Sequence, residues 1–417
     1  MENRTAVPPF LGITLLAAAI LMVTMGARQS MGLFVSPLNT ATGLGIATIS
    51  LAMAVAQFVY GAVQPIAGAL ADRYGHIRVV VAGVLLTAFG SAITPFMSSA
   101  WGLIFTIGLL TAAGSGTASF SVLIGATAQR IPTEKRGMSS GIINAGASFG
   151  QFVIAPLTAR LISGVGWMGA MWSLAVIALL ALPATGLLRR RVASQGTPAF
   201  AAPAATRVSA SATADGGLRA ALREAFANPS YLLLHAGFFT CGFHIAFLVT
   251  HLPGEIQLCG LPTEVAGWTL SIIGLANIVG SLLAGWSLQY YRGKHVLFVM
   301  YGSRSLWIIL YLLAPKTALT FYLFAVGLGL SWLATVPPTA GVVGKLFGTR
   351  YLATLFGLTL LSHQTGAFFG AWLGGLTVTA FGNYNWMWYA DITLAGLAAV
   401  LNLPIREAPV VRALKPA

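Results

Sequence analysis

The stretch Gly68-Ala-Leu-Ala-Asp-Arg-Tyr-Gly-His-Ile-Arg78 joins two apolar runs, each long enough to cross a bilayer as a helix. Asp72 and Arg73 are placed to close the membrane end of the first helix, and Gly75 permits a tight turn. Arg73 and Arg78 are cations of the kind that hold a loop on the cytoplasmic face. We therefore interpret Gly68, Asp72, Arg73, Gly75 and Arg78 as a gating loop between two transmembrane helices.

The composition is that of a membrane protein. Hydrophobic residues make up 57% of the 417 positions and charged residues 8%, whereas soluble domains carry about 25% charged residues. The 48 glycines indicate close helix packing, because lipid supplies no hydrophobic force to join helices and small side chains let them approach. The net charge is +14, and the cations lie mainly in every second one of the short loops that join the apolar runs. This distribution therefore indicates membrane orientation and excludes nucleic acid as a partner.

Twelve apolar runs have the length of a membrane-spanning helix. Only four cations fall inside them or in the predicted outer loops, which leaves 19 of the 23 on one side. This asymmetry predicts that both termini are cytoplasmic. The first run is too long for a signal peptide, so we expect it to remain in the membrane. The predicted spans are 10–35, 46–71, 77–97, 101–128, 138–162, 166–187, 229–252, 263–288, 295–314, 317–341, 351–377 and 386–405.

The chain divides into two similar halves. Residues 188–228 begin with three arginines and continue as a low-complexity Ala/Ser/Thr/Pro stretch with a short polar helix from Leu218, which predicts a cytoplasmic linker. Ala67-Gly68 recurs as Ala284-Gly285 at the equivalent place in the second half. We predict an all-α membrane protein with twelve transmembrane helices in two pseudo-symmetric six-helix bundles, residues 1–187 and 229–417.

Acidic residues are scarce inside the predicted spans. Of the nine, all but Asp391 lie outside the spans or at their ends, and Asp391 is close to the predicted outer start of its span. A carrier of cations needs an acid near its centre, because a charge in hydrocarbon requires a partner. The interior offers mainly cations and histidines, and this asymmetry favours an anionic substrate.

Polar side chains in several spans are candidates for binding that anion. Arg28 in the first span lies on a polar or small-residue face and can donate a bidentate pair of hydrogen bonds to a carboxylate; alternatively it extends to the outer interface. Gln29, Gln57, Asn144 and Asn277 can add hydrogen bonds; alternatively they join helices.

Histidines and one cysteine form a second group. His244 and Cys241 share a face of span 7, where His244 can serve as a proton-linked switch. With His235 and His251 they also suit a soft metal, although ordinary hydrogen-bonded packing is an equal alternative. His363 in span 11 either lines the cavity or bonds across a helix contact that the neighbouring glycines open.

Spans 9 and 10 carry one candidate each. Arg304 lies near mid-depth, where it contacts the substrate or satisfies backbone carbonyls of neighbouring helices. Trp332 precedes the helix-breaking pair Pro337-Pro338 and can wall a cavity or mark a hinge.

The spacing Gly-x3-Asp-Arg-x-Gly-x2-Arg in the opening stretch resembles the loop between spans 2 and 3 of the major facilitator superfamily. Residues 26–37 and 273–280 resemble the monocarboxylate-transporter and oxalate/formate-antiporter group. The resemblance implies that Arg28, Gln29, Gln57, Trp332 and His363 hold a carboxylate. The chain departs from the group in span 8, where Asn277 and Ser281 replace an acid and an arginine, and at His363, which replaces a lysine.

These features predict a secondary active transporter that moves a small, monocarboxylate-like anion across the bacterial inner membrane by alternating access. We expect a multi-pass monomer in the lipid bilayer without enzymatic activity, cofactor or bound metal, and proton coupling stays open. One alternative is a copper or other metal importer that uses the span 7 histidines. Another is a drug/proton efflux carrier, although span 4 lacks a cation and Gly150 is followed by Gln151 instead of proline.

Overall fold

The computed structural model of the chain describes residues 9–128, 131, 136–194, 217–348 and 351–408, and every regular element in these segments is helical. The elements of the first half are α1 (Pro9–Gln29), η1 (Met31–Phe34), α2 (Val35–Thr42), α3 (Ile46–Tyr74), α4 (His76–Ile93), η2 (Thr94–Phe96), α5 (Ala100–Leu103), η3 (Ile104–Thr111), α6 (Ala112–Thr117), α7 (Phe120–Ala128), α8 (Arg136–Leu179) and α9 (Ala181–Ser194). Those of the second half are α10 (Gly217–Ala227), α11 (Pro229–Leu258), α12 (Thr263–Tyr290), α13 (Gly293–Leu313), α14 (Ala318–Gly329), α15 (Val336–Phe347), α16 (Leu352–Phe381) and α17 (Asn385–Asn402).

Each of the twelve predicted spans corresponds to a helical segment. Eight segments of the described chain are long and apolar enough to cross a membrane, and the longest, Gly141–Arg189, contains two spans. It changes direction at Gly166, where a φ of 74° interrupts the helix and suits a residue without a Cβ. Span 10 is divided into α14 and α15, while α16 and α17 supply spans 11 and 12.

Several predicted boundaries move. The first span continues through the 3-10 turn η1 into α2 and ends at Thr42, past the predicted limit of 35; Gly43, with a φ of 65°, ends it in a left-handed cap. Helix α9 extends to Ser194, beyond the predicted start of the linker, and the predicted helix from Leu218 is present as α10. Linker residues 195–216 lie outside the described residues.

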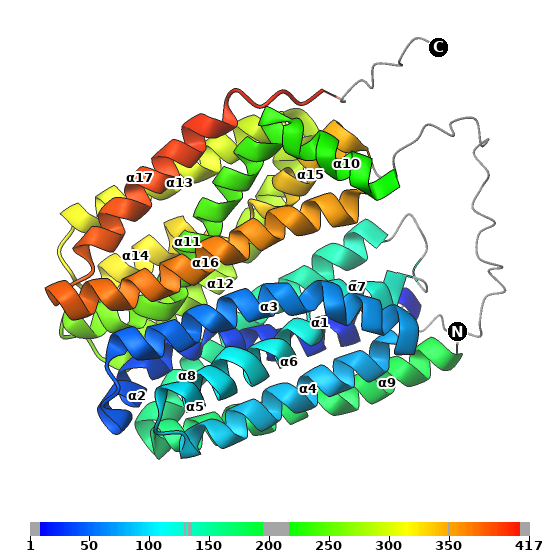
Figure 1. The fold of residues 1–417 in the computed structure, drawn as a ribbon. Coiled ribbons are helices and arrows are strands. Elements are labelled where there is room, and N and C mark those ends of the chain that lie inside the picture. Colours follow the sequence, from blue (N-terminus) through cyan, green and yellow to red (C-terminus); the bar gives the residue numbers. More distant parts are fainter. Residues whose placement is uncertain (1–8, 129–130, 132–135, 195–216, 349–350, 409–417) are drawn as a thin grey trace, which may run out of the picture.

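The helices form two bundles, with α1 to α9 in the lower half of Figure 1 and α11 to α17 in the upper half. Within the bundles, α1 packs on α8 and α11 packs on α16, which are equivalent pairs under exchange of the two halves. Between the bundles, α3 packs on α16 and α8 packs on α12, which are also equivalent. The pairing therefore has the pseudo-symmetry predicted from the sequence repeat.

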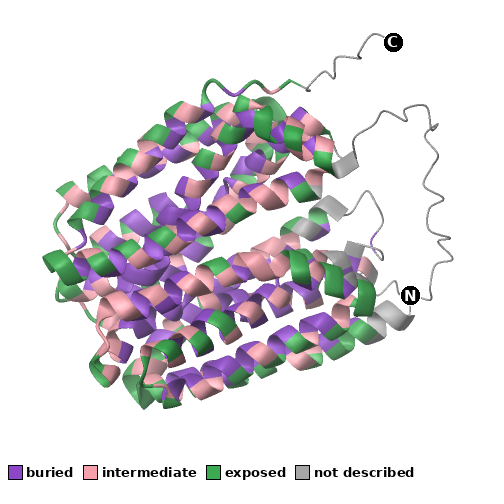
Figure 2. Ribbon diagram, in the orientation of Figure 1, coloured by how far each residue is buried: buried purple, intermediate pink, exposed green. Residues whose placement is uncertain are grey.

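Large apolar side chains cover much of the outer surface. Trp101, Leu282 and Leu313 are 79%, 71% and 80% exposed, and Figure 2 shows buried residues concentrated where helices face one another. A soluble monomer rarely exposes so much contiguous apolar surface. Lipid is the solvent that these side chains require.

Glycines make close contacts between the two bundles near one end of the molecule. At the end opposite the 68–78 loop, a Cβ on Gly32 would lie 1.9 Å from the Val249 carbonyl oxygen, and one on Gly375 would lie 2.3 Å from Ser50. At the loop end, Gly68 of α3 and Gly285 of α12 have no neighbour within 4 Å of that position. The tight glycine contacts between the bundles therefore lie at the face opposite the loop.

We predict that Gly32→Ala shifts the carrier toward the state that is open at the opposite face. The added methyl group overlaps the Val249 carbonyl only while the bundles are closed there, and overpacking of this kind costs about 1–3 kcal/mol. The alkylation rate of Ser50→Cys by a membrane-impermeant thiol reagent should rise about tenfold in this background. Gly285→Ala is the matched control, and equal rates in the two backgrounds would contradict the prediction.

Candidate functional site

Arg28 lies in the last turn of α1 and is held by two side chains of α3. Its Nη2 donates a hydrogen bond to Gln57 Oε1, and its Cζ lies 3.9 Å from the centroid of the Tyr60 ring. Gln57 and Tyr60 are three residues apart, so they share one face of the helix. Tyr60 is fixed in turn by a 3.3 Å contact from its hydroxyl to the Met25 sulfur.

The charge of Arg28 has no acidic counterpart among the described residues. Its polar contact is with the neutral amide of Gln57, and the ion pairs found in the described part of the chain lie elsewhere. A cation–π contact stabilises a guanidinium by about 0.5–2 kcal/mol but leaves its charge in place. Arg28 is half-buried, so its guanidinium is not enclosed by protein on every side.

The second bundle approaches this site through α16. A Cβ on Gly61 would lie 2.4 Å from the side chain of Gln364, and Gly61 is one turn beyond Gln57 on the same stripe of α3. Gln364 is 7% exposed, and its Oε1 has no hydrogen-bond partner, like the Nε2 of the buried Gln29 in α1. Arg28 and Gln57 therefore lie at the interface between the bundles.

Asn277 joins the bundles through α8 and α12. Its Nδ2 donates to Ser148 Oγ at 2.8 Å, and its Oδ1 accepts from the backbone nitrogen of Leu333 at 2.9 Å. Asn144 lies one turn before Ser148 on α8 and is half-buried. In this state Asn277 uses its amide to hold helices together, and separation of the bundles would free its donor.

Span 10 is broken between α14 and α15, and Arg304 of α13 holds the break. The guanidinium donates to the carbonyls of Ser331 and Trp332, the latter at 2.5 Å, and its Nη1 lies 3.3 Å from Cys241 Sγ. Backbone groups released by a helix break at membrane depth need such internal partners. Arg304 therefore satisfies carbonyls, as one of the two sequence-based interpretations predicted. Pro337 and Pro338 fit the first turn of α15, where the missing N–H costs nothing.

His244 and Asp391 form a buried pair between α11 and α17. His244 Nδ1 lies 2.5 Å from Asp391 Oδ2, and both side chains are 0% exposed. Glu255, predicted to lie outside the spans, belongs to α11 and accepts a 2.7 Å hydrogen bond from the Tyr311 hydroxyl. The prediction that the interior offers mainly cations and histidines therefore has to be corrected, because two acids are buried in this bundle with partners from other helices.

The remaining histidines point to separate neighbours. His235 Nδ1 bonds to Ser362 Oγ at 2.6 Å, and His251 Nε2 bonds to the Ala371 carbonyl at 2.7 Å. The ring of His363 packs 4.9 Å from that of Phe238, inside the C-terminal bundle. Within the described segments, no three His, Cys, Asp or Glu side chains converge as metal ligands. The histidines of span 7 therefore do not share one site.

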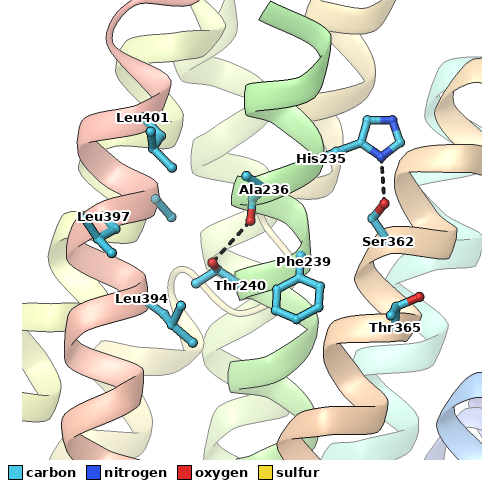
Figure 3. A pocket seen from close by; sticks show the side chains of 10 residues that line it. His235, Ala236, Phe239, Thr240, Ser362, Thr365, Leu394, Leu397 and Leu401 are labelled. Atoms are coloured by element: carbon cyan, nitrogen blue, oxygen red, sulfur yellow. Dashed lines mark hydrogen bonds between the residues drawn. The ribbon is translucent and has the colours of Figure 1, made fainter. Parts of the chain in front are cut away.

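A pocket of about 470 Å³ lies within the C-terminal bundle, between α11, α16 and α17. Figure 3 shows its apolar wall and the His235–Ser362 hydrogen bond at one side. Its lining carries no Asp, Glu, Lys or Arg, and none of it comes from α1 or α3. This pocket is distinct from the Arg28 site.

The 68–78 loop has the predicted tight turn. Gly75 has a φ of 94° and ends α3 and begins α4, and its N–H donates to the Ala71 carbonyl at 2.8 Å. Arg73 and Arg78 are exposed. The side chain of Asp72 lies outside the described part, so its gating role stays a prediction.

Comparison with known proteins agrees with this architecture. A family model described as Major Facilitator Superfamily matches residues 15–370. The chain belongs to this superfamily. It is a multi-pass membrane transporter rather than an enzyme. The chain is 26% identical over 360 residues to monocarboxylate transporter 13 of Rattus norvegicus, covering 85% of this chain and 78% of that protein.

Two further likenesses are informative. The chain is 24% identical to the oxalate:formate antiporter of Oxalobacter formigenes, over 88% of this chain and 84% of that protein. The crystal structure of a D-xylose-proton symporter superposes with a TM-score of 0.74 over 95% of this chain and 98% of that one. Its sequence identity is 14%, so this likeness shows the fold alone.

The structure thus separates the predicted site residues into two groups. Arg28, Gln57 and Asn277 lie at the interface between the bundles, whereas Cys241, His244, Arg304, Trp332 and His363 lie inside the C-terminal bundle. Gln29 is buried in α1, and Asn144 is half-buried in α8. Sequence reasoning overlooked Tyr60, which contacts Arg28, and Gln364, which approaches Gly61 on the same stripe of α3. The helical spacing of Tyr60 from Gln57 was a usable signal, but the approach of Gln364 depends on how the bundles pack.

Proposed function

We propose that the transporter carries a small organic anion of the monocarboxylate type, with Arg28 as its principal binding charge. The observation that carries the proposal is the guanidinium of Arg28, half-buried between the bundles and held only by neutral groups among the described residues. An incoming carboxylate would complete the missing ion pair with charge-assisted hydrogen bonds. Gln57, Gln364 and Gln29 would supply neutral donors around it.

Movement of this anion would follow from rocking of the two bundles. Contacts at Gly32 and Gly375 close one face of the described structure, while the glycines at the loop end face open space. The excess of cations on the loop side favours a cytoplasmic position for that face and for both termini. We place the carrier in the cell inner membrane and assign the present state as open to the cytoplasm.

The named relatives support the substrate class. Two of them are called a monocarboxylate transporter and an oxalate:formate antiporter, and both names refer to carriers of carboxylates. The departures at Asn277, Ser281 and His363 leave this chain without the charged residues that the group has there. We therefore propose a binding site whose charge comes from the first span.

A ligand panel tests the proposal. Formate, L-lactate and oxalate should raise the melting temperature of the purified carrier, whereas D-xylose, tetraphenylphosphonium and copper should not. A ligand at a hundred times its Kd stabilises the folded state by about 2.7 kcal/mol, which is readily measured. Stabilisation by xylose, the cation or copper without any response to carboxylates would overturn the anion assignment.

A further inference from the structure

The pair formed by His244 and Asp391 is unusual for the interior of a membrane bundle. The two residues are 147 positions apart, both are 0% exposed, and Nδ1 lies 2.5 Å from Oδ2. The other polar atom of each side chain, His244 Nε2 and Asp391 Oδ1, is buried without a hydrogen-bond partner. Buried polar atoms are normally satisfied, so this pair retains one free position for a proton on the imidazole.

The surroundings make that proton consequential. Cys241 lies one turn before His244 on α11 and contacts Arg304 of α13, whose guanidinium lies over the Tyr301 ring. His363 of α16 is buried in the same bundle. With His244 neutral, the charges of Asp391 and Arg304 balance. Uptake of a proton at Nε2 adds one positive charge in a medium of low dielectric constant, where charge interactions are strong. An anion entering the carrier would offset this added charge.

A continuous set of contacts leads from the pair to the interface between the bundles. The indole of Trp332 meets the His244 ring edge-on at 6.0 Å, and Trp332 lies in the break of span 10. Asn277 holds that break through Leu333 and reaches Ser148 of the N-terminal bundle. A change at His244 can therefore be transmitted through Trp332 to the break in span 10 and to the contact between the bundles.

We propose that His244 and Asp391 form the proton-binding site of this carrier, so that anion transport is coupled to proton movement. The inference rests on the proposed anion transport for its role, but the proton site itself does not. A proton from water enters at His244 Nε2 in one access state, is stabilised by the Asp391 carboxylate, and returns to water in the other state. One N–H bond forms as an O–H bond of hydronium breaks, and release of the proton reverses both changes.

Proton binding can be measured without a substrate. The purified full-length carrier, labelled with ¹³C-histidine, contains six histidines, and His244→Gln identifies the resonance of His244. The pH dependence of this resonance reports proton binding at His244 directly. Asp391→Asn should weaken proton binding at His244 at least about tenfold, because it removes the adjacent negative charge.

Transport assays then distinguish a role of the His244–Asp391 pair in proton coupling from a purely structural role. In proteoliposomes with ¹⁴C-lactate, Asp391→Asn should retain lactate exchange but lose at least about tenfold of the accumulation driven by a pH gradient. Glu264→Gln and His295→Gln, which alter exposed residues, should keep both activities. If His244 does not titrate, or titrates identically in Asp391→Asn, the proposal is overturned whichever substrate is carried.

The two proposals fail in different ways. If His244 titrates as expected but carboxylates neither stabilise nor cross, the anion assignment fails and the proton site stands. If wild-type and Asp391→Asn carriers accumulate lactate equally under a pH gradient, the coupling role fails while anion transport stands. If Asp391→Asn does not fold, the wild-type titration, assigned with His244→Gln, remains decisive.

Discussion

Arg28→Gln is expected to weaken carboxylate binding about a hundredfold and to abolish the thermal stabilisation that carboxylates confer on the wild-type carrier. The substitution keeps a polar side chain but removes the charge and the bidentate geometry. Hydrogen bonds to a charged group contribute about 1.5–3 kcal/mol, and 1.4 kcal/mol corresponds to a factor of ten. Binding of L-lactate and formate, measured by calorimetry, gives the ratio directly.

Two further variants make this expectation specific. Gln57→Glu places a carboxylate beside the guanidinium of Arg28, to which Gln57 is hydrogen-bonded. This carboxylate should form an internal ion pair with Arg28 and exclude the substrate as effectively as Arg28→Gln. Arg160→Gln removes an exposed cation of α8, shortly before its kink at Gly166, and should leave binding unchanged. Unaltered affinity in Arg28→Gln would show that the anion binds elsewhere.

Arg304→Met is expected to cause the largest loss of stability of any single substitution considered. The methionine fills part of the volume but leaves the carbonyls of Ser331 and Trp332 without their donor. An unsatisfied buried polar group costs about 1–3 kcal/mol. Interhelical hydrogen bonds in membranes average only about 0.6 kcal/mol because the groups find other partners. At a broken helix no such partner is available, so we expect the free energy of unfolding to fall by about 3 kcal/mol in total.

The chain supplies its own reporter for this measurement. Cys241 is buried beside Arg304, whereas Cys259 is half-buried, so in a Cys259→Ser background a thiol-reactive dye labels the carrier only as the bundle unfolds. The labelling midpoint should fall by several degrees in Arg304→Met and by less in Arg304→Lys, which keeps one donor group. Arg219→Met, at an exposed position of α10, should keep the wild-type midpoint. A wild-type midpoint in Arg304→Met would mean that the hydrogen bonds from Arg304 do not stabilise the break in span 10.

The sequence by itself determined the membrane spans, the two halves and the turn at Gly75. Each of these depends on a local property: the length of an apolar run, the distribution of cations between loops, or the conformational freedom of glycine. Arg28 and Gln57 could also be selected in advance, because polar side chains in hydrocarbon are conspicuous.

The tertiary structure alone decided which of those side chains meet. The helices are apolar on nearly every side, so the sequence carries little periodic signal for the face that each presents to its neighbours. The pairing of His244 with Asp391, the use of Arg304 at the break of span 10 and the approach of Gln364 to Gly61 follow from close packing at glycine contacts. Such contacts join residues far apart in the chain, and only the packed bundles bring them together.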